Sequence, residues 1–106
     1  MHEYELAAGA EDDLESIADY TTARWGAGQS RRYAPSLAGH FDALANGEAR
    51  TKTAFEDWPQ LRASRCEHHV VFSVRRGRRK LTILAVLHEN MDLLTRLRER
   101  LDPGPS

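Results

Sequence analysis

The first half of the chain shows two kinds of hydrophobic spacing in succession. Tyr4, Leu6 and Ala8 recur every second residue, which is typical of a short strand. A helical spacing follows, in which residues on one face recur three or four positions apart and predict an amphipathic helix: Leu14, Ile17, Ala18, Thr21 and Trp25. Gly26 is expected to end this helix, because glycine readily adopts positive φ after a last turn.

A second helical stripe follows almost at once and contains Tyr33, Leu37, Phe41 and Leu44. It closes at Asn46 and Gly47, and the short link before it predicts a helical hairpin. Pro35 lies inside the stripe, lacks an N–H and crowds the carbonyl four residues earlier, so we expect a kink or a late start. The next stretch, residues 47–59, has no sustained period and is expected to connect elements, pinned by Phe55 and Trp58.

The second half of the chain favours strands and then a final helix. Residues 70–74 and 81–87 are rich in β-branched residues, and Arg76, Gly77 and Arg78 between them suit a hairpin turn. Residues 61–66 are ambiguous and are counted as a third strand. A last helical stripe contains Met91, Leu94, Leu97 and Leu101, with Arg96, Arg98 and Arg100 on its other faces.

The element order is therefore β-α-α-β-β-β-α, and the fold class is α+β, with the helical hairpin packed on a small antiparallel sheet. We expect one domain over residues 1–101 and a disordered tail over 102–106. The predicted core contains Leu14, Ile17, Trp25, Tyr33, Phe41, Leu44 and Phe72.

Charge is divided between the two halves, although the 106 residues carry a net charge of only -1. Residues 1–49 hold three basic and nine acidic side chains, and residues 50–101 hold twelve basic and six acidic ones. The total argues against a highly basic nucleic-acid-binding protein. The basic excess is expected on the sheet face opposite the hairpin, which becomes the candidate functional face: Arg62, Arg65, Arg75, Arg76, Arg78, Arg79 and Lys80.

Cellular location is expected to be cytoplasmic, because the single Cys66 cannot form an intramolecular disulfide and no apolar leader is apparent. No apolar run is long enough to cross a membrane.

Several blocks of sequence resemble the ParE toxins of type II toxin–antitoxin modules, within the RelE/ParE superfamily. The resemblance covers roughly residues 4 to 97 and rests on these blocks at these spacings: Glu11-Asp12-Asp13-Leu14, then Ile17 and Tyr20; Arg24-Trp25-Gly26, then Gln29 and Tyr33; Phe41 and Leu44; Arg62 and His69-Val70-Val71-Phe72; Ile83-Leu84, Leu87-His88 and Met91-Asp92. Ser73 stands where the family usually has a tyrosine.

The resemblance implies a toxin that poisons DNA gyrase by trapping it with cleaved DNA. It also implies neutralisation by a ParD-like antitoxin, through which alone operator DNA would be bound. No cofactor is implied. Two alternatives stay open: a RelE-like endoribonuclease that cuts ribosome-bound messenger RNA, using Arg50, Lys52, Arg62, Arg65 and His88, and an inactive homologue that only binds its antitoxin.

His69 and His88 are expected to be neighbours at one end of the sheet. A general acid or base is one interpretation. We favour a structural role, with hydrogen bonds to the backbone or to Asp92, because nothing beside them completes a nucleophile–base set. Zinc is disfavoured, because strand alternation sends His68 and His69 to opposite faces and Cys66 lacks further ligands.

The remaining candidates are cations and aromatic residues. Arg62 and Arg65 are expected either to bind the target or antitoxin or to pair with Asp92 or Glu67. The run around Arg75 and Arg76 could contact phosphate or remain a solvated turn. We predict no catalytic residue and take these as candidate target- or antitoxin-binding residues: Arg62, Arg65, His69, Arg75, Arg76, His88 and Arg96. Trp25, Phe41 and Phe72 are assigned to the core rather than to a base-stacking platform, whereas Trp58 is expected to pack under the connecting segment or against the antitoxin.

Overall fold

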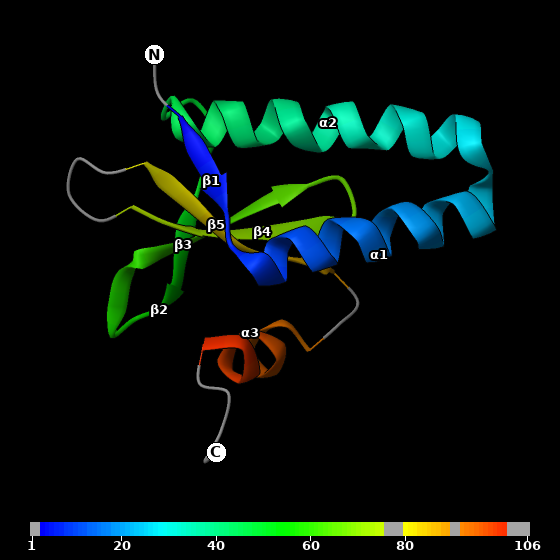
Figure 1. Cartoon of the computed structure of the whole chain (residues 1–106). Helices are drawn as coiled ribbons and strands as arrows, with labels where there is room; N and C mark the ends of the chain where they lie inside the picture. The colour runs from blue at the N-terminus through cyan, green and yellow to red at the C-terminus, as the bar shows by residue number, and fades with distance from the viewer. Residues whose placement is uncertain (1–2, 76–79, 90–91, 102–106) are drawn as a thin grey trace.

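The computed structural model describes residues 3–75, 80–89 and 92–101, and this part of the chain forms three helices and five strands (Figure 1). In chain order they are β1 (Tyr4–Leu6), α1 (Ala8–Trp25), α2 (Ala27–Ala45), β2 (Lys52–Phe55), β3 (Trp58–Cys66), β4 (His69–Val74), β5 (Leu81–His88) and α3 (Leu93–Leu101). The predicted α+β class is confirmed. The predicted turn at Arg76, Gly77 and Arg78 lies outside the described residues, as do Met91 and the tail 102–106.

The sheet has the strand order β1-β5-β4-β3-β2. Its last four strands are antiparallel, but β1 runs parallel to β5, with Tyr4 opposite Leu81. The sheet is therefore mixed rather than wholly antiparallel as predicted. A parallel neighbour is possible here because the whole intervening chain serves as the crossover between β1 and β5.

One strand was missing from the predicted order. β2 lies within the segment 47–59 that we expected only to connect elements, and it pairs with β3 through Phe55 opposite Trp58. The residues of β2 do not alternate between polar and apolar, and its outer position leaves Lys52 and Thr53 exposed. Phe55 and Trp58 are half-buried and pack against the hydrophobic cluster that contains Leu97, as expected of residues that pin this segment.

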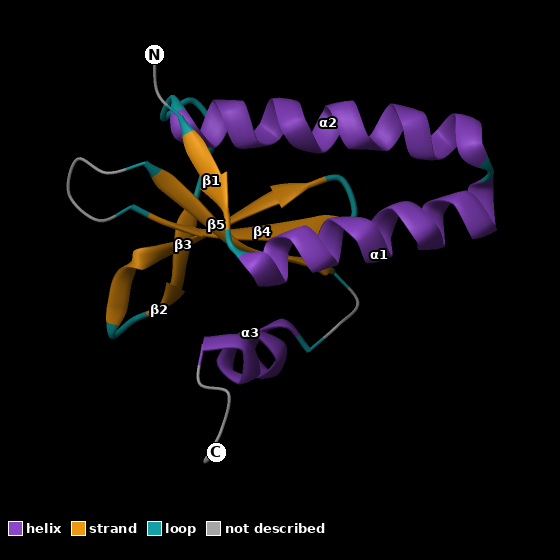
Figure 2. Ribbon diagram, in the orientation of Figure 1, coloured by secondary structure: helices purple, strands orange, loops and turns teal. Residues whose placement is uncertain are grey.

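The helical hairpin covers one face of the sheet and α3 lies on the other (Figure 2). Gly26, with φ of 91°, joins α1 to α2, and Gly47, with φ of 76°, follows the end of α2. α2 runs through Pro35 from Ala27 to Ala45, so the late start that Pro35 suggested is wrong. Pro35 is exposed, so its ring points to solvent, where water can replace the lost hydrogen bond at Arg31.

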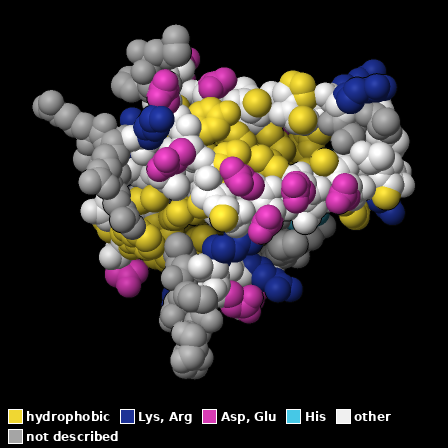
Figure 3. Space-filling view, viewed as in Figure 1, with side chains coloured by type: hydrophobic (Ala, Val, Ile, Leu, Met, Phe, Trp, Pro, Cys, Tyr) yellow, Lys and Arg dark blue, Asp and Glu magenta, His cyan; other side chains and the backbone are white. Residues whose placement is uncertain are grey.

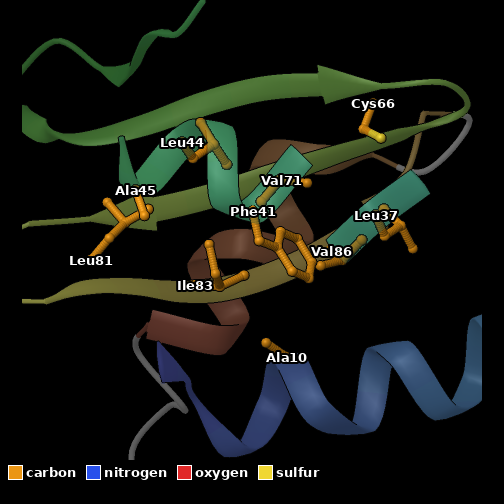
Figure 4. Packing of buried hydrophobic residues seen from close by; sticks show 10 residues of the cluster. All are labelled: Ala10, Leu37, Phe41, Leu44, Ala45, Cys66, Val71, Leu81, Ile83 and Val86. Atoms are coloured by element: carbon orange, nitrogen blue, oxygen red, sulfur yellow. The ribbon is translucent and has the colours of Figure 1, made fainter. Parts of the chain in front are cut away.

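Two hydrophobic clusters hold the layers together. The first lies between the hairpin and the sheet, around Phe41, Val71 and Ile83 (Figure 4). The second lies between the sheet and α3, where Leu97 is fully buried against Leu61 and Phe72. The sheet is thus buried on both faces, and the face opposite the hairpin is not the open basic surface that we expected.

Trp25 is the one predicted core residue that the structure places at the surface, with 63% of its area exposed. The reason is its position at the outer end of α1, where the hairpin projects beyond the sheet and no third layer lies beneath it (Figure 1). Trp25 instead packs beside Arg24, whose guanidinium lies 5.3 Å from the ring centroid.

α3 is fastened to the hairpin by an ion pair between Arg100 and Asp13. The Arg100 guanidinium donates to both Asp13 carboxylate oxygens at 3.0 Å. Asp13 Oδ2 also accepts a 3.0 Å hydrogen bond from the Val86 backbone N–H. β1 ends at Leu6, so Asp13 caps a part of β5 that β1 does not reach.

Candidate functional site

An open apolar groove runs between α1 and α2, where hydrophobic side chains gather in the view of Figure 3. Its floor is formed by Tyr4 and Phe41, whose rings meet edge to face with centroids 5.5 Å apart. The lining residues are Tyr4, Leu6, Leu14, Ile17, Ala18, Thr21, Tyr33, Ala34, Leu37, Ala38 and Phe41. An apolar groove has the chemistry to accept the apolar face of another segment.

Small side chains explain why the groove stays open. Ala34 and Ala38 lie on the α2 side, at positions where larger residues would fill the space between the helices. The hairpin also extends beyond the sheet, so its outer half is not closed from below (Figure 1). Leu14, Ile17 and Tyr33, predicted as core, are half-buried walls of this groove, whereas Phe41, Leu44 and Phe72 are buried.

His69 and His88 are paired across β4 and β5, as predicted, and their rings meet edge to face with centroids 5.2 Å apart. His69 Nδ1 is hydrogen-bonded to the Tyr33 hydroxyl, which comes from α2. Asp92, the carboxylate we expected to hold these histidines, instead accepts a 2.7 Å hydrogen bond from Thr95 Oγ1 at the start of α3. His69 therefore ties the sheet to α2, not to the last helix.

Burial governs the titration of His69 and of Tyr33. It lowers the pKa of His69 to about 4, with a smaller contribution from His88 and His68. Burial also raises the pKa of Tyr33 to about 12. At neutral pH both groups are uncharged, and a neutral His69 can accept the Tyr33 hydroxyl proton at Nδ1.

Arg62 and Arg75 lie on the hairpin side of the sheet, not on the opposite face as predicted. They border the same hollow as Leu44, Ala45 and Ser73, next to the end of α2. Among the described residues, neither guanidinium forms an ion pair with a carboxylate. Arg62 donates to Thr51 Oγ1 at 3.0 Å, to Thr53 Oγ1 at 3.0 Å and to the Thr51 carbonyl at 3.1 Å, and Arg75 donates to the Ala45 carbonyl at 2.7 Å.

Arg65 and Arg96 are placed differently. Arg65 lies on the other face of β3 from Arg62, since the two are three residues apart in a strand, and it forms an ion pair with Glu89. Arg96 is exposed on α3, and its Nη1 lies 3.7 Å from Glu99 Oε2. The expected partners of Arg62 and Arg65, Asp92 and Glu67, are therefore both wrong. Arg76 lies outside the described residues.

A second hollow adjoins the one beside Arg62 and Arg75. It lies between α2 and the outer strands, and the two hollows share Ala49 and Thr51 in their linings. We call this continuous surface the basic groove and define it by the lining cations that form no ion pair in the described part of the chain: Arg50, Lys52, Arg62 and Arg75. A fifth lining cation, Arg65, is paired with Glu89. Its wall is fixed by the buried Ser64, which is hydrogen-bonded to His40 Nε2 at 2.8 Å and donates to the Arg50 carbonyl at 2.9 Å.

Two functional contacts were missed by reasoning from the sequence. Asp13 holds Arg100 and the Val86 N–H, although in the sequence it stood out only as part of the Glu11-Asp12-Asp13-Leu14 block. Glu89 accepts hydrogen bonds from Arg65 and His68, and these lower the pKa of its carboxyl. In the part of the chain that the structure describes, no three His, Cys, Asp or Glu side chains come together as a metal site. None of the described helices has the length and apolar character needed to cross a bilayer.

Comparisons with known proteins agree with this geometry. The sequence model of the family described as "ParE toxin of type II toxin-antitoxin system, parDE" matches residues 4–93. The chain is 48% identical over 101 residues to Toxin ParE of Escherichia coli, covering 95% of this chain and 98% of that protein. It is 30% identical to Toxin ParE1 of Mycobacterium tuberculosis (strain CDC 1551 / Oshkosh), covering 85% of this chain and 92% of that protein.

A solved structure described as "Chromosomal ParDE TA system from P. aeruginosa" shares the fold, with a TM-score of 0.67 and 19% identity. The match covers 83% of this chain and 96% of the solved one. The order of strands and helices, the blocks of sequence that carry the resemblance and the two close relatives all lead to one assignment. The chain belongs to the ParE toxin family of type II toxin–antitoxin systems.

Proposed function

We propose that this toxin arrests growth by binding DNA gyrase and stabilising its complex with cleaved DNA. The observation that carries the proposal is the 48% identity to Toxin ParE over nearly the whole of both chains. The toxin acts as a protein inhibitor, and gyrase itself makes and holds the DNA break. The buried, neutral pair of Tyr33 and His69 supports this, because both groups already serve the packing between α2 and the sheet.

A ParD-like antitoxin neutralises the toxin by laying an apolar segment in the groove between α1 and α2. An amphipathic helix suits this groove, because residues on one face of a helix could pack between the walls formed by Ile17 and Leu37. The exposed acidic side chains along α1 border the groove (Figure 3) and favour basic residues at the edge of that segment. Acidic residues of the antitoxin could also pair with the basic half of the toxin. They would reach Arg62 and Arg75 only if the bound segment continues around α2.

The test uses the full toxin separated from its antitoxin. Gyrase supercoiling of relaxed plasmid should fall, and linear DNA should accumulate after the reaction is stopped with detergent and protease. Added antitoxin should restore supercoiling, which controls for contaminating nuclease. Normal supercoiling without linear DNA, at toxin concentrations well above that of gyrase, would contradict the proposal.

The endoribonuclease alternative is favoured by one observation, the basic groove, since cations beside a phosphate could stabilise a transition state. Translating ribosomes with a defined messenger separate the two functions. Cut messenger with normal supercoiling would establish the alternative. If both assays are silent, Ser73→Tyr tests the inactive homologue, although Ser73 is only 1% exposed and the larger ring would have to enter the hollow beside Arg62.

A further inference from the structure

Four neighbouring cations of the basic groove have no carboxylate partner among the described residues. Within the described part of the chain, ion pairs join Arg65, Lys80, Arg96 and Arg100 to carboxylates. None of these pairs involves the four cations that define the basic groove. A positive potential therefore remains along this surface.

Arg62 is also held in place before any ligand arrives. Its three guanidinium nitrogens donate to neutral oxygens of Thr51 and Thr53. Neutral acceptors orient the guanidinium without cancelling its charge, and three bonds leave two of its five N–H groups for a ligand. Arg75 is oriented in the same way by the Ala45 carbonyl at the end of α2.

The lining of the groove indicates which anion it fits. No Asp, Glu, Phe, Tyr or Trp is among the residues that line the two hollows, whereas hydroxyl and amide groups are present at Thr51, Ser73, Asn46 and Gln60. An acidic peptide would need large exposed apolar anchors for tight binding, whereas the apolar lining here consists of alanines and of the buried Leu44 and Leu81. Unstacked bases would need aromatic platforms. Phosphates of a closed duplex need only cations and polar donors along a line.

The acidic side of the molecule would orient such a ligand. Glu11, Asp12, Glu15 and Asp19 are exposed on α1, and the acidic row is visible along that helix (Figure 3). A polyanion is repelled from this side and attracted to the side of α2 that faces the outer strands.

We propose that the basic groove binds the sugar–phosphate backbone of duplex DNA, without regard to base sequence. The inference rests on the proposed function only for its setting, in which the duplex is the DNA held by gyrase. The binding itself requires no gyrase. Sequence-specific recognition of operator DNA remains with the antitoxin, because the groove offers contacts to phosphates and not to base edges.

The experiment measures fluorescence anisotropy of a short labelled DNA duplex with the full toxin over a range of salt concentrations. Arg62→Gln with Arg75→Gln should weaken binding at least about tenfold and reduce the slope of log affinity against log salt by about 2. Arg31→Gln with Arg32→Gln is the matched control, since it removes the same charge from two exposed residues of α2 that line neither hollow. The control should stay within about twofold of the natural toxin.

A second variant guards against loss of folding at Arg62 and Arg75, whose bonds link the outer strands and the end of α2. Arg50→Gln with Lys52→Gln removes two exposed cations and should weaken binding to a similar degree, with circular dichroism confirming the fold of each protein. Equal affinity and equal salt slope in both groove variants and the natural toxin would overturn the proposal.

Competitors decide the class of ligand. Polyglutamate that binds more tightly than the duplex, with the same dependence on Arg62 and Arg75, would overturn the proposal in favour of an acidic protein. An RNA duplex that binds more tightly would overturn it in favour of RNA. A toxin that inhibits gyrase but binds no free duplex would preserve the proposed function and overturn this inference. A toxin that binds the duplex but does not inhibit gyrase would preserve this inference and overturn the proposed function.

Discussion

The two flanks of α2 differ in charge and in the size of the apolar side chains that line them. One flank, with Ala34 and Ala38, forms the apolar groove with α1 and sits above a packed hydrophobic cluster. The other flank, with His40 and Ala43, faces the outer strands across the basic groove. One helix therefore separates a surface suited to an apolar segment from a surface suited to an anion.

The difference shows how a single sheet produces two grooves. The hairpin covers β5 and β4, so apolar residues there become core, and small residues between the helices leave a furrow above it. β3 and β2 extend past α2, so residues on the same face, such as Arg62 and Thr51, border a polar hollow. The chemistry of each groove follows from whether a helix lies over that part of the sheet.

The largest expected effect is at the floor of the apolar groove. Phe41 is 2% exposed, and Phe41→Ala should lower the free energy of unfolding by about 3–5 kcal/mol, because it removes a ring and leaves a cavity between α2 and the sheet. Urea denaturation measures the loss. Trp25→Ala is the control and should cost less than about 1 kcal/mol, since that ring is largely exposed. Equal losses would show that the outer end of the hairpin is part of the core.

The next effect is a dependence of stability on pH that comes from His69, where α2 meets the sheet. The unfolded pKa is 6.5 and burial lowers the folded value to about 4, so below pH 6.5 the unfolded chain binds a proton that the folded protein does not. Stability from this residue is complete above pH 6.5 and falls towards pH 4, by at most about 3 kcal/mol.

Urea denaturation at a series of pH values between these limits measures this loss. His69→Gln should make the profile less steep, because glutamine does not titrate, and the slope that remains includes that of His40, whose pKa burial also lowers. His68→Gln is the control and should keep most of the slope, since His68 makes only a smaller contribution to the lowered pKa of His69. A profile of the natural protein that is already flat would contradict the prediction.

The third effect tests whether the antitoxin binds in the apolar groove, with a substitution at an exposed residue outside the core. Ala38→Glu should weaken binding of the ParD-like antitoxin by about 100-fold, or about 2.7 kcal/mol, because docking would bury an unpaired carboxylate. Titration calorimetry measures the affinity. Ala23→Glu is the matched control, since Ala23 is an exposed alanine of α1 outside the groove. Unchanged affinity in Ala38→Glu would move the antitoxin to another surface.

The smallest effect concerns the basic flank. Arg62→Gln should change the free energy of unfolding by less than about 1 kcal/mol, because the three hydrogen bonds it removes are exposed and water can replace them. Thermal denaturation followed by circular dichroism measures the change. A loss as large as that of Phe41→Ala would mean that Arg62 is needed for the fold and would weaken the case for a binding surface.

Periodicity predicted most of the fold but not which surfaces stay open. Phe41, Leu44 and Phe72 follow clear stripes and are buried, and the pairing of His69 with His88 follows from the two strands on either side of a turn. Trp25 follows the same helical stripe yet is exposed, because a stripe identifies a face and not what covers it.

The candidate site was predicted less well than the fold. The cations were identified correctly as a group, but Arg62 and Arg65 were placed on one face although an odd spacing in a strand separates them. The partners Thr51 and Glu89 could not be predicted, because the residues of β2 do not alternate between polar and apolar and ion pairs depend on three-dimensional proximity.

The parallel pairing of β1 sets the order in which the protein can be completed during translation. Tyr4 and Leu6 form part of the apolar groove, and β1 is held in place by pairing with residues 81–83. The ribosome makes β1 before the hairpin and makes β5 only after two helices and three further strands. The groove is therefore finished only after β5 has been made, so a nascent chain that has not reached β5 cannot yet present the full surface to its antitoxin.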